Sequence, residues 1–258
     1  MKLQWLGTAG FQVHTGEHIF LIDPYLSRNP KARPIQTMRP NDIGNAEQIF
    51  ISHGHWDHIH DVPAITKHNQ CSIYCSKTAA NTLKRKGVDN RHIHAVNKDG
   101  YRIDFEGYSA QAYFSRHIVF DIPLAARTLR NIGDSWPRLL KMHAGYPQGQ
   151  VLSWRFRING YTIHHFGSAG AIREELDRFA TETTDVLLVP VQGHTRICEI
   201  SLEYVRLLKP RMVIAHHHDH FYPPISSEID ITPFVNAVRE TCSGTEVRVP
   251  EINETVEI

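Results

Sequence analysis

Short apolar strands alternate with helices along most of the chain, and this alternation restricts the folds that it can adopt. The clearest local signal is Asn159-Gly160, which divides "VLSWRFRI" from "YTIHHFG" and predicts a β-hairpin. Helices are expected at 171–180, 199–208 and 232–240, and strands at 185–191, 211–215 and 245–249. Because no Gly/Ser-rich linker interrupts residues 1–258, the chain is expected to form one layered domain, with sheets inside and helices outside.

The N-terminal half follows a similar rhythm. Strands are expected at 2–6, 10–15, 18–23, 48–52, 71–75, 101–105 and 108–114, and helices at 61–67 and 77–86. Asp61 is the predicted N-cap of the first of these helices, and Gly87 closes the second. Residues 118–149 break the rhythm and read as a lid-like insertion, in which Leu124, Leu129 and Ile132 anchor a short helix. The basic residues of this segment are expected to point away from these anchors. They either form an ordinary solvated surface or bind a phosphate or carboxylate of the substrate, and they are Arg127, Arg130, Arg138 and Lys141.

The composition is that of an ordinary soluble protein, with 41% hydrophobic and 21% charged residues. A formal net charge of +1 offers no electrostatic basis for nucleic acid as the main partner. No stretch approaches the ~18 apolar residues that are needed to span a bilayer. The four cysteines (Cys71, Cys75, Cys198 and Cys242) lack CxxC spacing and are expected to be free thiols, which favours a cytoplasmic protein.

Histidine is enriched, with 18 residues in the chain, and it is concentrated in "ISHGHWDHIHDV" at residues 51–62. This cluster directly follows an apolar strand. Residues two apart in an extended segment face the same side, so that His53 and His55 can converge on one point. Asp57 and His58 offer a carboxylate and an imidazole close by, and such ligands suit zinc, manganese or iron. Chance clustering of this kind is rare, and we therefore expect a metal site here.

The motif His53-x-His55-x-Asp57-His58, placed between a strand and a helix, resembles the signature of the metallo-β-lactamase superfamily. The opening stretch "LGTAGFQVHTGEHIFLIDP" is similar to the branch that contains ascorbate-phosphate lactonases and N-acyl-phosphatidylethanolamine phospholipase D. The resemblance implies an α+β fold, a four-layer αβ/βα sandwich with the metals at one edge between the sheets. It also implies that Asp23, from "IDP", buttresses the metal loop.

Further ligands follow from the resemblance. It implies His117 in "AYFSRHIVF", although a histidine at a strand end is also compatible with an ordinary surface position. It implies a last ligand in "RMVIAHHHDH", where His217 matches the expected position and His216 is the nearest alternative. His53, His55 and His117 would then hold one metal, and Asp57, His58 and His217 a second.

One position departs from the pattern. Where the superfamily usually has Gly-Asp-x-Gly, with an aspartate that bridges two metals, this chain has Gly167-Ser168-Ala169-Gly170. A serine hydroxyl is a poor ligand at neutral pH and carries no charge. The alternatives are a single metal, two metals with a solvent bridge alone, or a substitute ligand from His164, His165 or His194.

The resemblance implies a metal-dependent hydrolase that uses one or two Zn²⁺ ions, with Mn²⁺ or iron as alternatives. A metal-bound hydroxide would attack an ester, lactone or phosphodiester bond of a small-molecule or lipid-like substrate. Asp57 would orient the attacking water and accept its proton, and His194 in "VPVQGHTR" would stabilise an oxyanion or protonate a leaving group. His194 as a water-exposed loop histidine is the competing interpretation. The second function class is a degenerate metal-binding member without turnover, acting as a ligand-binding or interaction module.

Overall fold

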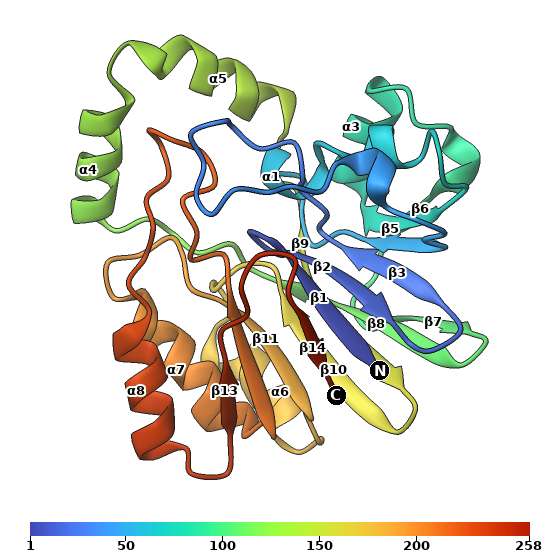
Figure 1. Ribbon diagram of the computed structural model, residues 1–258, viewed down its shortest axis with the longest axis vertical. Coiled ribbons are helices and arrows are strands. Elements are labelled where there is room, and N and C mark those ends of the chain that lie inside the picture. The colour runs from blue at the N-terminus through green and yellow to red at the C-terminus, as the bar shows by residue number, and fades with distance from the viewer.

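The computed structural model describes the backbone of residues 1–258 and all side chains except those of Asp134, Arg138 and Leu139. Its strands form two seven-stranded sheets (Figure 1). The first sheet contains, in spatial order, β14 (Thr255–Glu257), β1 (Lys2–Gly7), β2 (Gly10–His14), β3 (Ile19–Ile22), β4 (Gln48–Phe50), β5 (Ser72–Ser76) and β6 (Ile93–Val96). The second contains β13 (Glu246–Arg248), β12 (Met212–His216), β11 (Val186–Pro190), β10 (Tyr161–Phe166), β9 (Val151–Ile158), β8 (Tyr108–Ser115) and β7 (Tyr101–Phe105).

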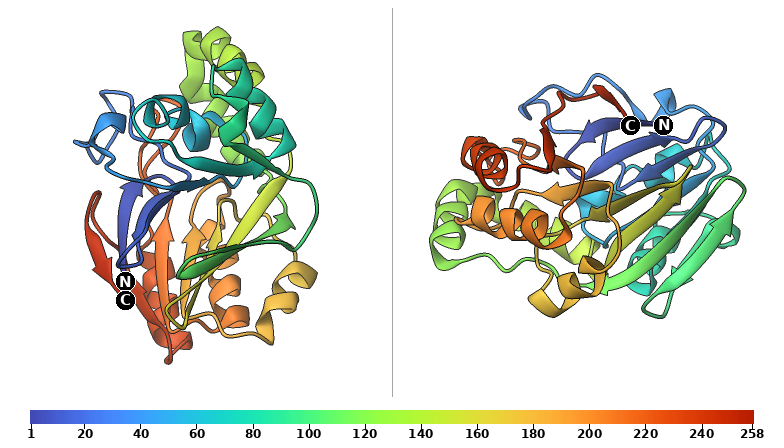
Figure 2. Two further views of the ribbon diagram at one scale, coloured as in Figure 1. Left: turned by 90° about the vertical axis from the view of Figure 1, so that its right-hand side faces the viewer. Right: turned by 90° about the horizontal axis from the view of Figure 1, so that it is seen from below.

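Helices cover the outer face of each sheet (Figure 2). The first sheet carries α1 (Trp56–Ile59), α2 (Val62–Ile65) and α3 (Lys77–Arg85), and the second carries α6 (Arg173–Ala180), α7 (Ile197–Leu208) and α8 (Thr232–Thr241). Single 3₁₀ turns lie at Pro40–Asp42, Asn90–His92 and Gly133–Ser135. The layers therefore follow the order helix, sheet, sheet, helix, and the expected α+β four-layer αβ/βα sandwich is confirmed. No helix in the described structure has both the length and the apolar character required to cross a membrane.

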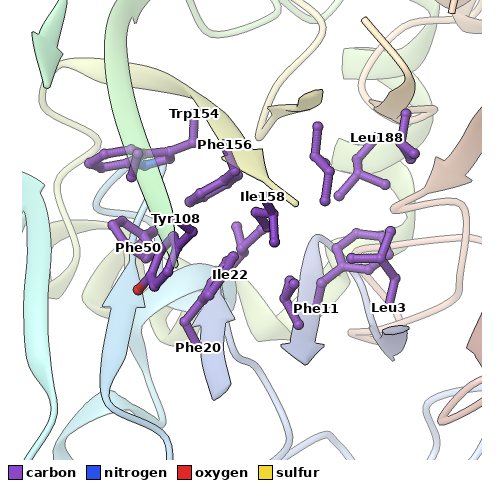
Figure 3. Packing of buried hydrophobic residues seen from close by; sticks show 14 of the residues in the cluster. Leu3, Phe11, Phe20, Ile22, Phe50, Tyr108, Trp154, Phe156, Ile158 and Leu188 are labelled. Carbon is purple, nitrogen blue, oxygen red and sulfur yellow. The ribbon is translucent and has the colours of Figure 1, made fainter. Parts of the chain in front are cut away.

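The main core lies between the two sheets and is rich in aromatic rings (Figure 3). Phe20 from β3 stacks on Phe156 from β9 with 4.8 Å between ring centroids, and Phe50 from β4 meets Trp154 from β9 at 5.0 Å. These rings come from alternate positions of their strands, because a period of two directs every second side chain inward. Each such side chain contributes roughly 1.5–3 kcal/mol by leaving water. Separate apolar clusters fill the space between each sheet and its helices.

The hairpin at Asn159-Gly160 is confirmed, since both residues have the positive φ values, 51° and 84°, that a tight hairpin turn requires. The expected strands and helices are also present, with ends that differ by a few residues. Strands β6 and β14 and the later helix of the 118–149 segment were not predicted. The two strands are too short to show a periodic pattern. Asp61 is the N-cap residue of α2 as predicted, but its side chain makes no cap bond and instead accepts from the backbone N–H groups of Leu26 and Ser27.

Residues 118–149 form two helices, α4 (Ile122–Ile132) and α5 (Trp136–Gly145), which stand apart from the sheets in Figure 1. Leu124 and Ile132 are buried as expected. Leu129, in contrast, is 59% exposed, so its predicted anchoring role was wrong. Five residues separate Leu124 from Leu129, and this spacing places them on different sides of a helix with 3.6 residues per turn. Arg127, Arg130 and Lys141 are exposed, and the side chain of Arg138 lies outside the described part.

Candidate metal centre

The candidate site forms where several strands of the second sheet end together. Strands β10, β11 and β12 are mutually parallel, and β8 runs in the same direction because both β8 and β10 are antiparallel to β9. Their carboxyl ends deliver His117, Ser168, His194 and His217 to one edge. The remaining residues come from the loop and short helix α1 that follow β4 in the other sheet. Residues far apart in sequence are thereby brought together at the edge between the two sheets.

The first ligand group consists of His53, His55 and His117, whose ligand nitrogens all lie within 4.8 Å of one another. Nε2 of His53 is 3.1 Å from Nδ1 of His55. Nδ1 of His117 donates to the carbonyl oxygen of Ile118 at 2.7 Å, which leaves Nε2 of His117 free to face the group. Nδ1 of His53 is likewise in contact with the Ser52 hydroxyl at 3.0 Å. Such bonds orient the rings and select which nitrogen is available as a ligand.

The second ligand group consists of Asp57, His58 and His217, with ligand atoms again within 4.8 Å of one another. Oδ2 of Asp57 is 3.7 Å from Nε2 of His58 and 3.3 Å from Nε2 of His217. Behind them, Nδ1 of His58 donates to Oδ2 of the fully buried Asp23 at 2.8 Å. Asp23 also accepts from the Ser52 backbone N–H at 2.7 Å. The buttressing role that the resemblance implied for Asp23 is therefore visible in its contacts.

The structure places His217, and not His216, in the second group. His217 has a φ of 63° and its N–H donates to the Thr8 carbonyl at 2.8 Å. This left-handed turn directly after β12 redirects the chain at the site. His216 is the last residue of the strand and is fully buried between the sheets, where its ring stacks on that of His165 at 5.1 Å.

Burial and neighbouring charges shift the pKa values of three of these residues toward the form that binds metal. Burial lowers the pKa of His55 to about 3, and burial together with the neighbouring histidines lowers the pKa of His53 far below its usual range. Burial by itself would raise the pKa of Asp57, but His58 and a hydrogen bond from His217 outweigh it, so that the pKa is lowered. At neutral pH the rings of His53 and His55 are therefore neutral and able to bind a metal, and the carboxylate of Asp57 is ionised.

The family model described as the beta-lactamase superfamily domain matches residues 2–217 of the chain. The chain belongs to this superfamily. Among its curated relatives, the UPF0173 metal-dependent hydrolase of Pelotomaculum thermopropionicum is 29% identical and covers 100% of both chains. The UPF0173 metal-dependent hydrolase of Thermoplasma acidophilum is 26% identical over 100% of this chain and 99% of the relative.

Two solved structures show the same fold at low sequence identity. Igni18, a metallo hydrolase from Ignicoccus hospitalis, superposes with a TM-score of 0.73 at 22% identity, covering 99% of this chain and 97% of the other. The isothiocyanate hydrolase from Delia radicum gut bacteria superposes with a TM-score of 0.70 at 17% identity, covering 100% and 99%. These likenesses establish the metallo-β-lactamase fold.

Ser168, for which the resemblance implies the position of a bridging aspartate, belongs to neither ligand group. Its Oγ accepts a hydrogen bond from the Ile118 N–H at 2.9 Å. The flanking glycines allow this close approach: a Cβ at Gly170 would lie 2.3 Å from the carbonyl carbon of His117, and one at Gly167 would lie 2.2 Å from Cβ of Ser52. The loop therefore fixes the backbone that carries His117.

None of the three alternative ligands considered for this position joins either group. His164 is fully buried on the helix side of the second sheet, where its ring lies 4.2 Å from that of Phe166 and 4.5 Å from that of Phe179. Nε2 of His165 contacts the Ala9 carbonyl oxygen at 3.2 Å. His194 lines the pocket described next.

A pocket of about 500 Å³ opens over both ligand groups. His194 lies in its wall, and Nδ1 of His194 accepts from the Arg196 N–H at 3.0 Å, so that Nε2 is free for a bound molecule. The 118–149 segment supplies another part of the wall. From α5 it contributes His143, whose ring centroid lies 5.8 Å from that of His55. The sequence analysis missed His143, because no motif surrounds it and only the fold of this segment places it at the site.

Proposed function

We propose that the two ligand groups bind transition-metal ions and that the protein hydrolyses a small molecule in the pocket above them. The protein is a metal-dependent hydrolase of the beta-lactamase superfamily. The proposal is supported mainly by one observation: two groups of three potential metal ligands line the same pocket. Three imidazoles in one set, and two imidazoles with a carboxylate in the other, are donors that fit Zn²⁺, with Mn²⁺ or iron as alternatives.

When bound, such an ion supplies Lewis acidity and lowers the pKa of a water ligand to about 7. The chain's own residues do the rest. Asp57 is ionised and lies between the two imidazoles of its group, where its carboxylate can orient the attacking water and accept a proton from it. His194, with Nε2 free, acts from the pocket wall as a hydrogen-bond donor to a developing oxyanion or a leaving group. Asp23 holds His58 in position throughout.

We infer that the bond cleaved is an ester, lactone or phosphodiester. The pocket wall supports a substrate with substantial apolar character, because it includes Ile118, Leu124, Trp136, Phe221 and Ile225. Such a substrate agrees with the similarity of the opening stretch to N-acyl-phosphatidylethanolamine phospholipase D, whose substrate is a lipid. We further propose that residues 118–149 act as a lid, since they line the pocket and cover neither sheet.

Ser168 favours one alternative, a member of the superfamily that binds metal or ligand without turnover. Its hydroxyl is engaged with the Ile118 N–H and adds no charge between the two donor sets. Two dications next to each other repel, and a bridging carboxylate normally offsets that repulsion. In this alternative the site would retain its metal and its pocket but would lack a competent nucleophile.

Turnover of a panel of phosphodiesters, lactones and esters, measured together with metal content, tests the proposal. The protein prepared without chelator is expected to contain a first-row transition metal and to hydrolyse at least one bond class. His55→Ala is expected to remove both the metal of the first group and the activity. His68→Ala, a substitution of an exposed histidine, provides the matched control and should change neither. Bound metal without turnover of any panel member would favour the alternative.

A further inference from the structure

Beyond the two ligand groups, the pocket wall is largely apolar with one strongly cationic side chain. Its apolar residues are Ile118, Phe120, Leu124, Trp136, Leu140, Met142, Phe221, Ile225 and Ile229. Among the side chains that the structure describes, Arg127, from α4, is the only lysine or arginine that lines it. Among those same side chains, the only carboxylate in the lining is that of Asp57, which belongs to the second ligand group. A guanidinium in such a wall is a marked electrostatic feature.

Arg127 has no carboxylate partner among the side chains that the structure describes. Its Nη2 reaches only the hydroxyl of Ser227, at 3.4 Å. Arg127 is exposed, whereas two arginines with buried side chains are neutralised: Arg28 pairs with Asp219, and Arg155 pairs with Glu182. Arg127 therefore retains donors for a ligand. A planar guanidinium can donate two parallel hydrogen bonds to a carboxylate or phosphate, which is the geometry that gives arginine its preference for these anions.

Neighbouring polar groups complete a small recognition surface. Asn131 lies four residues after Arg127 on α4, so that both side chains project from the same face of the helix, and both line the pocket. Ser227 lies beside them in the wall. These groups add neutral hydrogen-bond donors around the guanidinium, whereas an acidic side chain at any of these positions would repel an anion.

We propose that the substrate is an amphiphilic anion, in which an apolar body carries a carboxylate or phosphate that Arg127 binds. This inference rests on the proposed function and adds to it a substrate class and a residue that determines specificity. Hydrolysis adds the hydroxyl of water to the electrophilic centre and a proton to the leaving oxygen. The anion at Arg127 does not react. It fixes the apolar body in the pocket so that the scissile bond lies at the ligand groups.

The volume of about 500 Å³ agrees with this class, since pockets for small molecules usually span ~300–1,000 Å³. The pocket also supplies its own reporters. Trp56 and Trp136 line it, whereas Trp5 and Trp154 are buried in the core. Binding of a non-reactive ligand is therefore expected to change the intrinsic fluorescence of the protein, independently of any turnover.

Two matched esters test the inference: the 4-nitrophenyl monoester of suberic acid, which is anionic, and 4-nitrophenyl octanoate, which has the same chain length and is neutral. We expect Arg127→Gln to lower kcat/KM for the anionic ester by about 10-fold or more and to leave the neutral ester within about twofold. Arg130→Gln, on the same helix but outside the pocket lining, is the control and should leave both esters unchanged. Arg127→Lys, which keeps the charge, should restore part of the loss.

Binding of decanoate, decyl phosphate and decanol, followed by tryptophan fluorescence, provides a second readout. The two anions should bind more tightly than decanol, and only Arg127→Gln should remove the difference; their relative affinities distinguish carboxylate from phosphate. The inference is overturned if Arg127→Gln and Arg130→Gln act alike, or if decanol binds as tightly as the anions. Arg127-dependent binding of the anions without hydrolysis of either ester would contradict ester cleavage as the reaction and leave the binding site standing. Hydrolysis that does not depend on Arg127 would overturn this inference alone.

Discussion

Asp23 and His58 are hydrogen bonded at the base of the candidate metal centre, with 2.8 Å between Oδ2 and Nδ1. Both side chains are almost completely buried. Burial lowers the pKa of His58, but the charges of Asp23 and Asp57 outweigh it, and the pKa is raised overall. Asp23 thus fixes the ring so that Nε2 faces the second ligand group. Asp23 directly follows β3, and His58 follows the parallel neighbour β4, so the contact joins the ends of these two strands.

Asp23→Asn should weaken metal binding at the second ligand group by about 10- to 100-fold, because the ring of His58 loses its charged partner and its fixed orientation. Titration of metal-free protein with Zn²⁺ against a competing chelator measures the change. Asp177→Asn, in the exposed ion pair of α6, is the matched control and should have no effect. Equal affinities for Asp23→Asn and the parent would show that the contact does not support the metal.

Ser168→Asp should tighten the second of two unequal metal-binding steps. The parent is expected to bind one equivalent tightly at the three-histidine group, because the second group lacks a bridging charge. The new carboxylate would supply that charge. Stoichiometry and turnover of this variant and the parent provide the measurement. A tighter second step with a lower rate would instead indicate that serine serves a dedicated single-metal mechanism.

Gly170→Ala should destabilise the metal-free protein by about 1–3 kcal/mol, because the new methyl group would overlap the backbone of His117 and must displace it. Metal binding at the first group should weaken as well. Gly44→Ala is a suitable control, since Gly44 is exposed and an added Cβ there meets no atom within 4 Å. Urea denaturation and metal titration of both variants test the expectation, which fails if the two behave alike.

His164 should make the metal-free protein less stable in acid. Burial, with a smaller contribution from the charge of Arg155, lowers the pKa of His164 far below its ordinary value of 6.5. In the unfolded chain the residue takes up a proton below that value, whereas in the folded protein it stays neutral. Its contribution to stability is therefore complete above about pH 6.5 and is lost as the pH falls further, by about 1.4 kcal/mol per pH unit.

His164→Phe should accordingly reduce the slope of unfolding free energy against pH between pH 6.5 and 5 by about that amount. Denaturation curves of metal-free parent and variant across this range measure the slope. His68→Gln, at an exposed position, should leave it unchanged. An unaltered slope for His164→Phe would mean that the buried ring takes up its proton without unfolding.

The sequence by itself determined the layered architecture and most of the ligand set. Periods of two and of 3.6 residues are local properties of the backbone, so the strands, the helices and the hairpin at Asn159-Gly160 could be predicted from neighbouring residues. The pair His53 and His55 follows from the same reasoning, because an extended segment places them on one side. Likeness to a known motif extended this to His117 and to the stretch that contains His216 and His217.

Only the tertiary structure decided which of these side chains meet. The choice of His217 over His216 depends on a left-handed residue whose N–H binds Thr8, more than 200 positions earlier in the chain. Tertiary packing also decided three other features. They are the exposure of Leu129, the hydrogen bond between Ser168 and Ile118, and the contact between Arg127 and Ser227. Each depends on how distant segments pack, and a period read along one segment carries no information about the atoms that another segment places against it.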